Sequence, residues 1–212
     1  MTASSLEGPV SRYLNRRLSR PLARLLAPTP ISPNQVSLLS FLVALGAFAA
    51  FGLEQAIVAG VLIQASSVID GVDGDLARLQ HRESRFGAVF DAFLDRAADA
   101  VIVAGMAWWA FDHPGSSGPQ PFVVGLAAMT GFLMISYSRA RMESEGYREL
   151  LAGPALLAGR DVRLLIAAIG SAAGQPYWTL VALGSVTYLA LVWRLWLVYR
   201  SDGARRRAAL GS

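Results

Sequence analysis

Six aspartates lie in one stretch of thirty residues, and the segments on both sides of this stretch are apolar enough to form membrane helices. They follow the run AIVAGVLIQASSVI (residues 56–69) and precede the run AVIVAGMAWWAF (residues 100–111), and they are Asp70, Asp73, Asp75, Asp91, Asp95 and Asp99. A carboxylate at membrane depth costs several kcal/mol unless another group compensates its charge, so such acids indicate a functional site. A divalent cation is the compensator that clustered carboxylates can share.

The spacing of these acids places them in pairs. Asp70 and Asp73 are three residues apart, and Asp91 and Asp95 are four apart, so each pair shares one helix face. At about 1.5 Å of rise per residue, both pairs lie about 8–9 Å from the arginines that mark the polar ends of their helices. Oxygen ligands suit Mg²⁺ or Mn²⁺ better than zinc or copper. The chain has no cysteine, and both histidines lie outside the cluster.

The same stretch resembles the signature of the CDP-alcohol phosphotransferases, D-x2-D-G-x2-A-R-x8-G-x3-D-x3-D. Every fixed position of the signature matches: Asp70, Asp73, Gly74, Ala77, Arg78, Gly87, Asp91 and Asp95. The resemblance implies a membrane enzyme with two divalent cations, Mg²⁺ or Mn²⁺. Such an enzyme cleaves the pyrophosphate of a CDP-linked alcohol, releases CMP and joins the phosphoryl group to an acceptor hydroxyl. The resemblance also implies a homodimer.

Roles for the site residues follow from this resemblance. We assign the metal ligands as Asp70, Asp73 and Asp91, with Asp95 beside the second metal and acting as the general base. We assign the donor and nucleotide side to Pro33, Asn34, Asp73, Gly74, Ala77, Arg78, Ser84 and Gly87. The glycines either leave room for the nucleotide or allow close helix packing. Asp75 is outside the fixed pattern and faces either the cytidine or the headgroups. The alternative for the acids is a structural pair neutralised by Arg78 and Arg96.

A second group of arginines suggests the acceptor side. Arg139 and Arg141 end one apolar segment, and Arg160 and Arg163 begin the next. Arginine makes bidentate contacts with phosphate, so this group predicts an acceptor that itself carries a phosphate. The alternative is that these are ordinary arginines on the cytoplasmic side of a membrane protein.

Short runs of sequence narrow the substrates. The run ISYSRAR resembles the corresponding run of phosphatidylinositol-phosphate synthases, whose acceptor is inositol phosphate. The runs DGVDGDLAR, SPNQVS and GRDVR resemble those of di-myo-inositol-phosphate phosphate synthases, which use CDP-inositol and inositol phosphate. We therefore expect CDP-inositol as donor and inositol phosphate as acceptor, with a phospholipid synthase using CDP-diacylglycerol as the alternative. The second group often carries a fused cytidylyltransferase, so a separate cytidylyltransferase is an expected partner.

The hydropathy pattern predicts an all-α integral membrane protein. Residues 1–30 form an amphipathic interfacial helix and lead-in, or a solvated basic lead-in. Residues 31–200 form the membrane domain, and residues 201–212 form a polar, frayed tail. Six spans are expected, at residues 33–53, 56–79, 86–111, 122–137, 162–173 and 177–199, with Ser32 as N-cap of the first. The fifth span is shorter than the roughly 20 residues needed to cross, so a re-entrant helix is its alternative.

The arginines predict the orientation. All 19 basic residues are arginine, and they fall on or near the side that holds both termini under a six-span topology. This pattern places the termini and the carboxylates on the cytoplasmic face of the cell membrane. The arginines form no separate basic domain, which argues against nucleic-acid binding. A cation-coupled transporter is a distant alternative, because the sequence shows no internal repeat and its acids lie near one membrane face.

Overall fold

The computed structural model of the chain describes residues 8–113, 120–152 and 158–210, with side chains up to residue 203. Within these ranges the chain is helical and contains no strand, as the sequence predicted. After a π-helical turn, η2 (Ser11–Asn15), the α-helices are α1 (Arg16–Leu26), α2 (Pro33–Gly52), α3 (Ala56–Leu79), α4 (Arg85–Asp112), α5 (Pro121–Ser144), α6 (Arg160–Ala172) and α7 (Pro176–Leu210). A short 3₁₀ turn, η3 (Arg148–Leu151), lies between α5 and α6.

Four helices of the described chain are long and apolar enough to cross a membrane: α2, α3, α5 and residues 176–203 of α7. Helix α4 has 28 residues, or about 42 Å of length, but its first half carries the charged residues of the motif. Helix α6 has 13 residues, or about 20 Å, which is shorter than the roughly 30 Å hydrocarbon core. The apolar helices therefore indicate a membrane protein, and the fifth of the six predicted spans is too short to cross as a straight helix.

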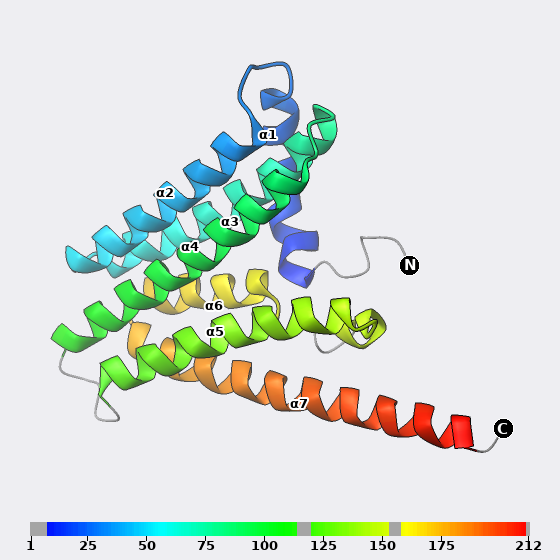
Figure 1. Cartoon of the computed structure of the whole chain (residues 1–212). Helices are drawn as coiled ribbons and strands as arrows, with labels where there is room; N and C mark the ends of the chain where they lie inside the picture. Colours follow the sequence, from blue (N-terminus) through cyan, green and yellow to red (C-terminus); the bar gives the residue numbers. More distant parts are fainter. Residues whose placement is uncertain (1–7, 114–119, 153–157, 211–212) are drawn as a thin grey trace.

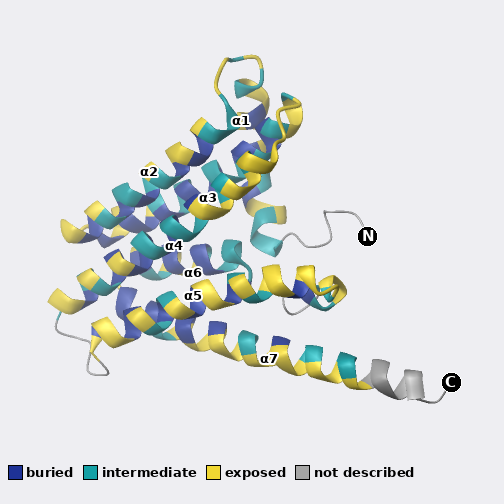
Figure 2. Ribbon diagram, viewed as in Figure 1, coloured by how far each residue is buried: buried dark blue, intermediate teal, exposed yellow. Residues whose placement is uncertain are grey.

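The helices form two groups that diverge toward one end of the molecule. In Figure 1, α2, α3 and α4 run together toward the upper right, whereas α5 runs nearly horizontally to the right and α7 runs toward the lower right. The α3–α4 turn and the C-terminal ends of α5 and α7 lie at this end, and α6 lies between the groups. The core joins both groups through Phe51, Ile63, Met106, Phe132 and Leu180. Figure 2 shows that the outer faces of α5 and α7 are exposed, as expected for lipid-facing helices.

The N-terminal helix packs on α3 through small residues. Asn15, Ser19 and Ala23 are buried, while the leucines of its outer face are exposed. Ala23 contacts a small core formed by Val36, Val72 and Leu76. An outer face of leucines and arginines is the pattern expected for a helix in the membrane interface, and that location stays a prediction.

Helix ends follow the sequence signals with one exception. Ser32 is the N-cap of α2: its Oγ accepts from the Gln35 N–H at 3.4 Å, and the Gln35 side chain accepts from the Ser32 N–H at 2.8 Å. This confirms the predicted cap. The predicted frayed tail is wrong for the described residues, because α7 continues as one helix to Leu210. Alanine and arginine have high helical propensity, and residues 204–209 consist of these two residue types.

Candidate active site between two cavities

Three carboxylates converge where α3 faces α4. One oxygen from each of Asp70, Asp91 and Asp95 lies within 4.8 Å of the others. All three side chains are partly buried, so water solvates them incompletely. An all-oxygen set with this separation fits Mg²⁺ or Mn²⁺, which bind carboxylates and retain water or phosphate ligands.

Asp73, the fourth predicted metal ligand, lies beside this group and not within it. It is 7% exposed, and its carboxylate accepts a hydrogen bond from the hydroxyl of Ser37 on α2. It lines a cavity together with Asp91. Asp73 therefore lies one helical turn from Asp70, at a position from which its carboxylate can reach a ligand that Asp91 also binds.

A first cavity of about 240 Å³ lies between the ends of α2, α3 and α4 that the sequence predicts to face the cytoplasm. We refer to it as the donor cavity. Its lining contains all eight residues that the sequence assigned to the donor and nucleotide: Pro33, Asn34, Asp73, Gly74, Ala77, Arg78, Ser84 and Gly87. Residues from three helices meet here because the i, i+3 and i, i+4 spacing of the motif keeps its fixed positions on facing sides of α3 and α4.

The two motif glycines of this cavity have different surroundings. The Cβ of a side chain at Gly87 would lie 3.0 Å from Ser84 Oγ and 3.3 Å from Asn34 Oδ1, so both neighbours would have to shift to make room for it. At Gly74 the nearest atom is Arg78 Nη2 at 3.9 Å, so packing imposes no such limit. Ser84 is the N-cap of α4, and its Oγ accepts from the Gly87 N–H at 2.9 Å. Gly74 therefore has space on the side where a ligand would approach the helix backbone.

A second cavity of about 440 Å³ reaches the same carboxylates from the other side. We refer to it as the acceptor cavity. Asp91 lines both cavities, whereas Asp70 and Asp95 line this one. The remaining walls come from the N-terminal segment, α3, α6, the C-terminal part of α5 and the middle of α7, including Ser11, Asn15, Arg16, Arg139, Arg160, Asp161 and Arg194.

The structure brings two of the four predicted acceptor arginines to this cavity. Arg139 and Arg160 line it. Arg141 does not: its side chain is 63% exposed and pairs with Glu145 at 2.7 Å. Arg163 does not line it either, because it is buried, with its guanidinium 4.1 Å from the ring centre of Phe132.

The model of the family described as CDP-alcohol phosphatidyltransferase matches residues 30–200. This chain belongs to the CDP-alcohol phosphatidyltransferase family. The match covers every described α-helix except α1 and the last turns of α7.

The chain resembles family members whose names give two different activities. The "Bifunctional IPC transferase and DIPP synthase" of Rubrobacter xylanophilus is 43% identical over 187 residues, which are 87% of this chain and 41% of that protein. The chain thus spans less than half the length of that relative. The "Phosphatidylinositol phosphate synthase" of Mycolicibacterium smegmatis is 34% identical over 200 residues, 89% of this chain and 86% of that one. The crystal structure of Mycobacterium tuberculosis phosphatidylinositol phosphate synthase with CDP-DAG bound has a TM-score of 0.68 and 26% identity, covering 84% of this chain and 92% of the other.

In this family member, Arg160 neutralises much of the carboxylate charge. Its Nη1 lies 2.7 Å from Asp70 Oδ2 and 2.8 Å from Asp95 Oδ1, and its Nε lies 3.0 Å from Asp99 Oδ1. Asp99 is 1% exposed and also has Arg163 and Arg96 within 3.6 and 3.7 Å. A buried carboxylate is tolerated when it is paired in this way. Arg160 Nη2 has no hydrogen-bond partner among the described residues, so this arginine keeps donors for a further anion.

Sequence reasoning missed Arg194 as a wall of the acceptor cavity. It lies in the apolar run ALVWRLWLV of α7, is 5% exposed, and donates to Ile135 O at 2.7 Å and Ser138 Oγ at 2.9 Å. The signal was available, because a lone charged residue inside an apolar segment indicates function by default.

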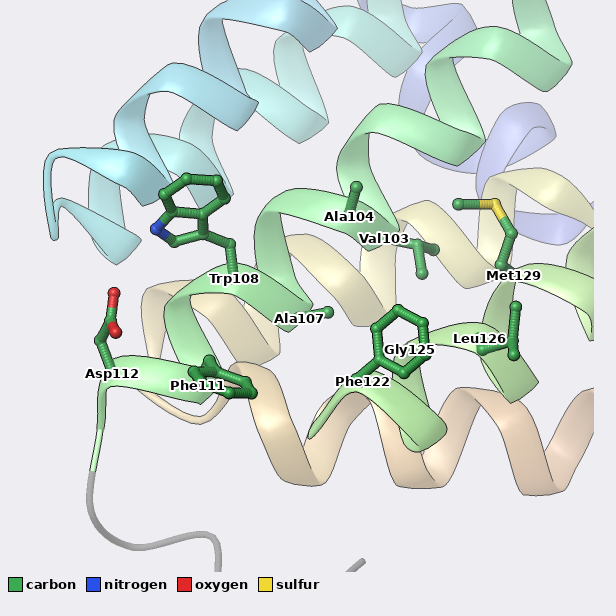
Figure 3. A pocket seen from close by; sticks show the side chains of 10 residues that line it. All are labelled: Val103, Ala104, Ala107, Trp108, Phe111, Asp112, Phe122, Gly125, Leu126 and Met129. Carbon is green, nitrogen blue, oxygen red and sulfur yellow. The ribbon is translucent and has the colours of Figure 1, made fainter. Parts of the chain in front are cut away.

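An apolar groove of about 510 Å³ lies elsewhere in this family member, between the C-terminal half of α4 and the start of α5. Figure 3 shows Trp108, Phe111 and Phe122 around it, with Asp112 at its edge. It contains none of the three converging carboxylates. Phosphoryl transfer needs charged groups around the phosphorus, so this groove is not the candidate active site.

Proposed function

We propose that this chain is a metal-dependent CDP-alcohol phosphotransferase that moves a substituted phosphate from a CDP-linked alcohol to an acceptor hydroxyl and releases CMP. One observation carries the proposal: Asp91 belongs to both cavities, with the donor motif on one side and arginines on the other. Two substrates bound in these cavities meet at the carboxylates, which is what direct transfer between them requires.

The donor cavity provides positive charge and close backbone approach. Arg78 lines it with its side chain 53% exposed, so the guanidinium can reach a donor phosphate. Gly74 lets the nucleotide lie close to α3. Family membership and the match of all fixed motif positions support these roles.

Divalent cations would be held by Asp70, Asp91 and Asp95, with Asp73 completing a second site from the donor side. When bound, Mg²⁺ or Mn²⁺ neutralises the pyrophosphate and stabilises the charge that develops on departing CMP. The separation of the three carboxylates supports such a site.

Asp95 is the proposed general base. It lines the acceptor cavity and is absent from the lining of the donor cavity, so it lies where the incoming hydroxyl must give up its proton. Its carboxylate also contacts Arg160 and Arg96, at 2.8 and 3.4 Å. These contacts fix its orientation, so it acts by position as well as by proton affinity.

The acceptor phosphate is assigned to Arg139, Arg160 and Arg194, which come from three helices around one cavity. Arg160 has an unpaired Nη2, and Arg194 has an unpaired Nε among the described residues. Buried guanidinium groups with unused donors favour a phosphate ligand. Arg141 and Arg163 are left out of this assignment because they do not line the cavity.

For the substrates, CDP-inositol with inositol phosphate is our first proposal. It rests on the short sequence runs and on the resemblance to the Rubrobacter protein. A second candidate is synthesis of a phosphatidylinositol phosphate from CDP-diacylglycerol. The likeness to the synthases that are matched over most of their length favours it. A homodimer, and a separate cytidylyltransferase that supplies CDP-inositol, belong to the first proposal.

In the membrane, we propose that α2 to α7 form the six-span unit, with both termini and both cavities at the cytoplasmic face. The short α6 completes the fifth crossing together with the residues that flank it. The four long apolar helices and the arginine distribution support this. Helix α1 would lie in the interface, with its leucines in the lipid and its arginines at anionic headgroups.

Product identification tests the function. The purified full chain is incubated with Mg²⁺, inositol phosphate and either CDP-inositol or CDP-diacylglycerol, and the products are identified by mass spectrometry. A water-soluble inositol phosphodiester from CDP-inositol supports the first proposal, and a phospholipid from CDP-diacylglycerol supports the second. Asp91→Asn serves as control, because equal CMP release by this variant and the wild type would identify a contaminant as the source. Absence of CMP release from both donors refutes the proposed function.

A further inference from the structure

Asp75 lies next to the family motif but outside its fixed positions. It follows Gly74 on α3 and precedes Arg78 by three residues, and it is 8% exposed. A carboxylate this deeply buried needs compensation, and its partners show what it is coupled to.

The partners of Asp75 come from both sides of α3. Its Oδ1 lies 2.7 Å from Arg78 Nη2, which lines the donor cavity. The same oxygen lies 2.6 Å from Arg16 Nη1 on α1, and Oδ2 accepts from the hydroxyl of the buried Ser19 at 3.2 Å. One carboxylate therefore joins the N-terminal helix to the arginine of the donor motif.

Arg78 benefits from such a partner. Its side chain is 53% exposed, so without Asp75 it would be free to adopt many rotamers, and ordering them costs free energy on binding. The contact with Asp75 uses one guanidinium nitrogen, and the group retains other N–H donors for a phosphate. A negative charge beside a phosphate site would normally weaken it. Arg16 offsets this charge, because two arginines and one aspartate leave one net positive charge on this group of three side chains.

We infer that Asp75 is a positioning residue that holds Arg78 toward the donor cavity, with Arg16 of the N-terminal helix as its counter-charge. The N-terminal helix α1 then contributes to donor binding as well as to attachment at the membrane. This inference rests on the proposed function, because it takes the donor to be a CDP-linked alcohol.

A double-mutant cycle tests it, with CDP as the probe. CDP binding to the purified full chain is measured by calorimetry at fixed Mg²⁺ for the wild type, Asp75→Ala, Arg78→Ala and the double variant. We expect Asp75→Ala to weaken CDP binding roughly threefold to tenfold in the wild-type background, and by less than about twofold when Arg78 is already alanine. An equal loss in both backgrounds would show that Asp75 does not act through Arg78 and would overturn the inference.

Further variants separate positioning from folding. Asp75→Asn keeps the volume and one acceptor, so it replaces the alanine variant if that protein does not fold, with the same expected dependence on Arg78. Ser19→Ala removes a contact between α1 and Asp75 without touching Arg78, and CDP affinity should stay within about twofold of the wild type. A loss as large as that of Asp75→Ala would mean that Asp75 only anchors the helix. Arg16→Gln should weaken CDP binding about threefold, and an unchanged affinity would remove Arg16 from the inference.

The outcomes distinguish this inference from the proposed function. A wild-type protein that binds no CDP and releases no CMP contradicts the function itself. A wild-type protein that binds CDP and is active, but whose cycle is additive, contradicts the role of Asp75 alone.

Discussion

Replacement of Arg139 by alanine should selectively weaken binding of the acceptor. Arg139 lines the acceptor cavity, and one charge-assisted hydrogen bond contributes about 1.5–3 kcal/mol, which corresponds to roughly 10- to 150-fold in affinity. Its side chain is 47% exposed and its Nε lies 3.3 Å from Glu143, so solvent and a competing carboxylate reduce this value. We therefore expect the lower end, a rise of about tenfold in the KM for inositol phosphate.

Arg141 is a matched control for this prediction. It ends the same helix, carries the same charge and also pairs with a glutamate, but it does not line the cavity. Arg141→Ala should change the KM for inositol phosphate by less than about twofold. CMP release is measured at saturating donor and constant ionic strength, because long-range attraction of the substrate varies with salt.

Three results would refute the reasoning. Equal effects of the Arg139 and Arg141 variants on KM would mean that both act through general positive charge at this membrane face. An equal rise in the KM values of donor and acceptor would place Arg139 on the donor side. Turnover of unphosphorylated inositol with undiminished efficiency would remove the need for an acceptor phosphate site.

Three further predictions follow from the carboxylates and the helix packing. Asp91→Asn should abolish CMP release and weaken Mn²⁺ binding measured by calorimetry, because the residue lines both cavities; near-wild-type turnover would contradict its role as a metal ligand. Asp95→Asn should bind CDP with nearly unchanged affinity but release almost no CMP in the presence of acceptor, and a loss of CDP binding would make it chiefly a ligand for the metal. Gly60→Ala should lower the thermal unfolding midpoint, because the added Cβ would lie 2.5 Å from the backbone oxygen of Ala168. The resulting overpacking costs about 1–3 kcal/mol of folding free energy. Gly52→Ala is the control and should not lower the midpoint, because its Cβ would have no atom within 4 Å.

The donor side was predictable because its signal is a fixed spacing. Residues three and four apart on two helices must lie on defined faces, so the motif also placed six of its eight fixed positions around the donor cavity. Ser32 as N-cap was predictable for a similar local reason.

The acceptor side was less predictable because its residues come from separate helices. Arg139 and Arg141 are two residues apart, about 200° around a helix, so they cannot both face one cavity, and helix geometry alone could have excluded one of them. Arg163 faces Phe132 and Asp99 instead of the cavity, which depends on the rotation of α6 and not on sequence spacing. The contribution of Asn15 and Arg16 depends on how the N-terminal segment docks, which no local pattern specifies.

The position of Asp91 between two separate cavities has a kinetic consequence. Because the proposed donor and acceptor sites reach the carboxylate group from different sides, neither substrate has to leave before the other enters. The phosphoryl group can then pass directly between two bound molecules, without forming a covalent intermediate with a side chain of the protein. Such an enzyme follows a sequential rate law that requires a ternary complex, and radiolabelled CMP does not exchange into the donor while the acceptor is absent.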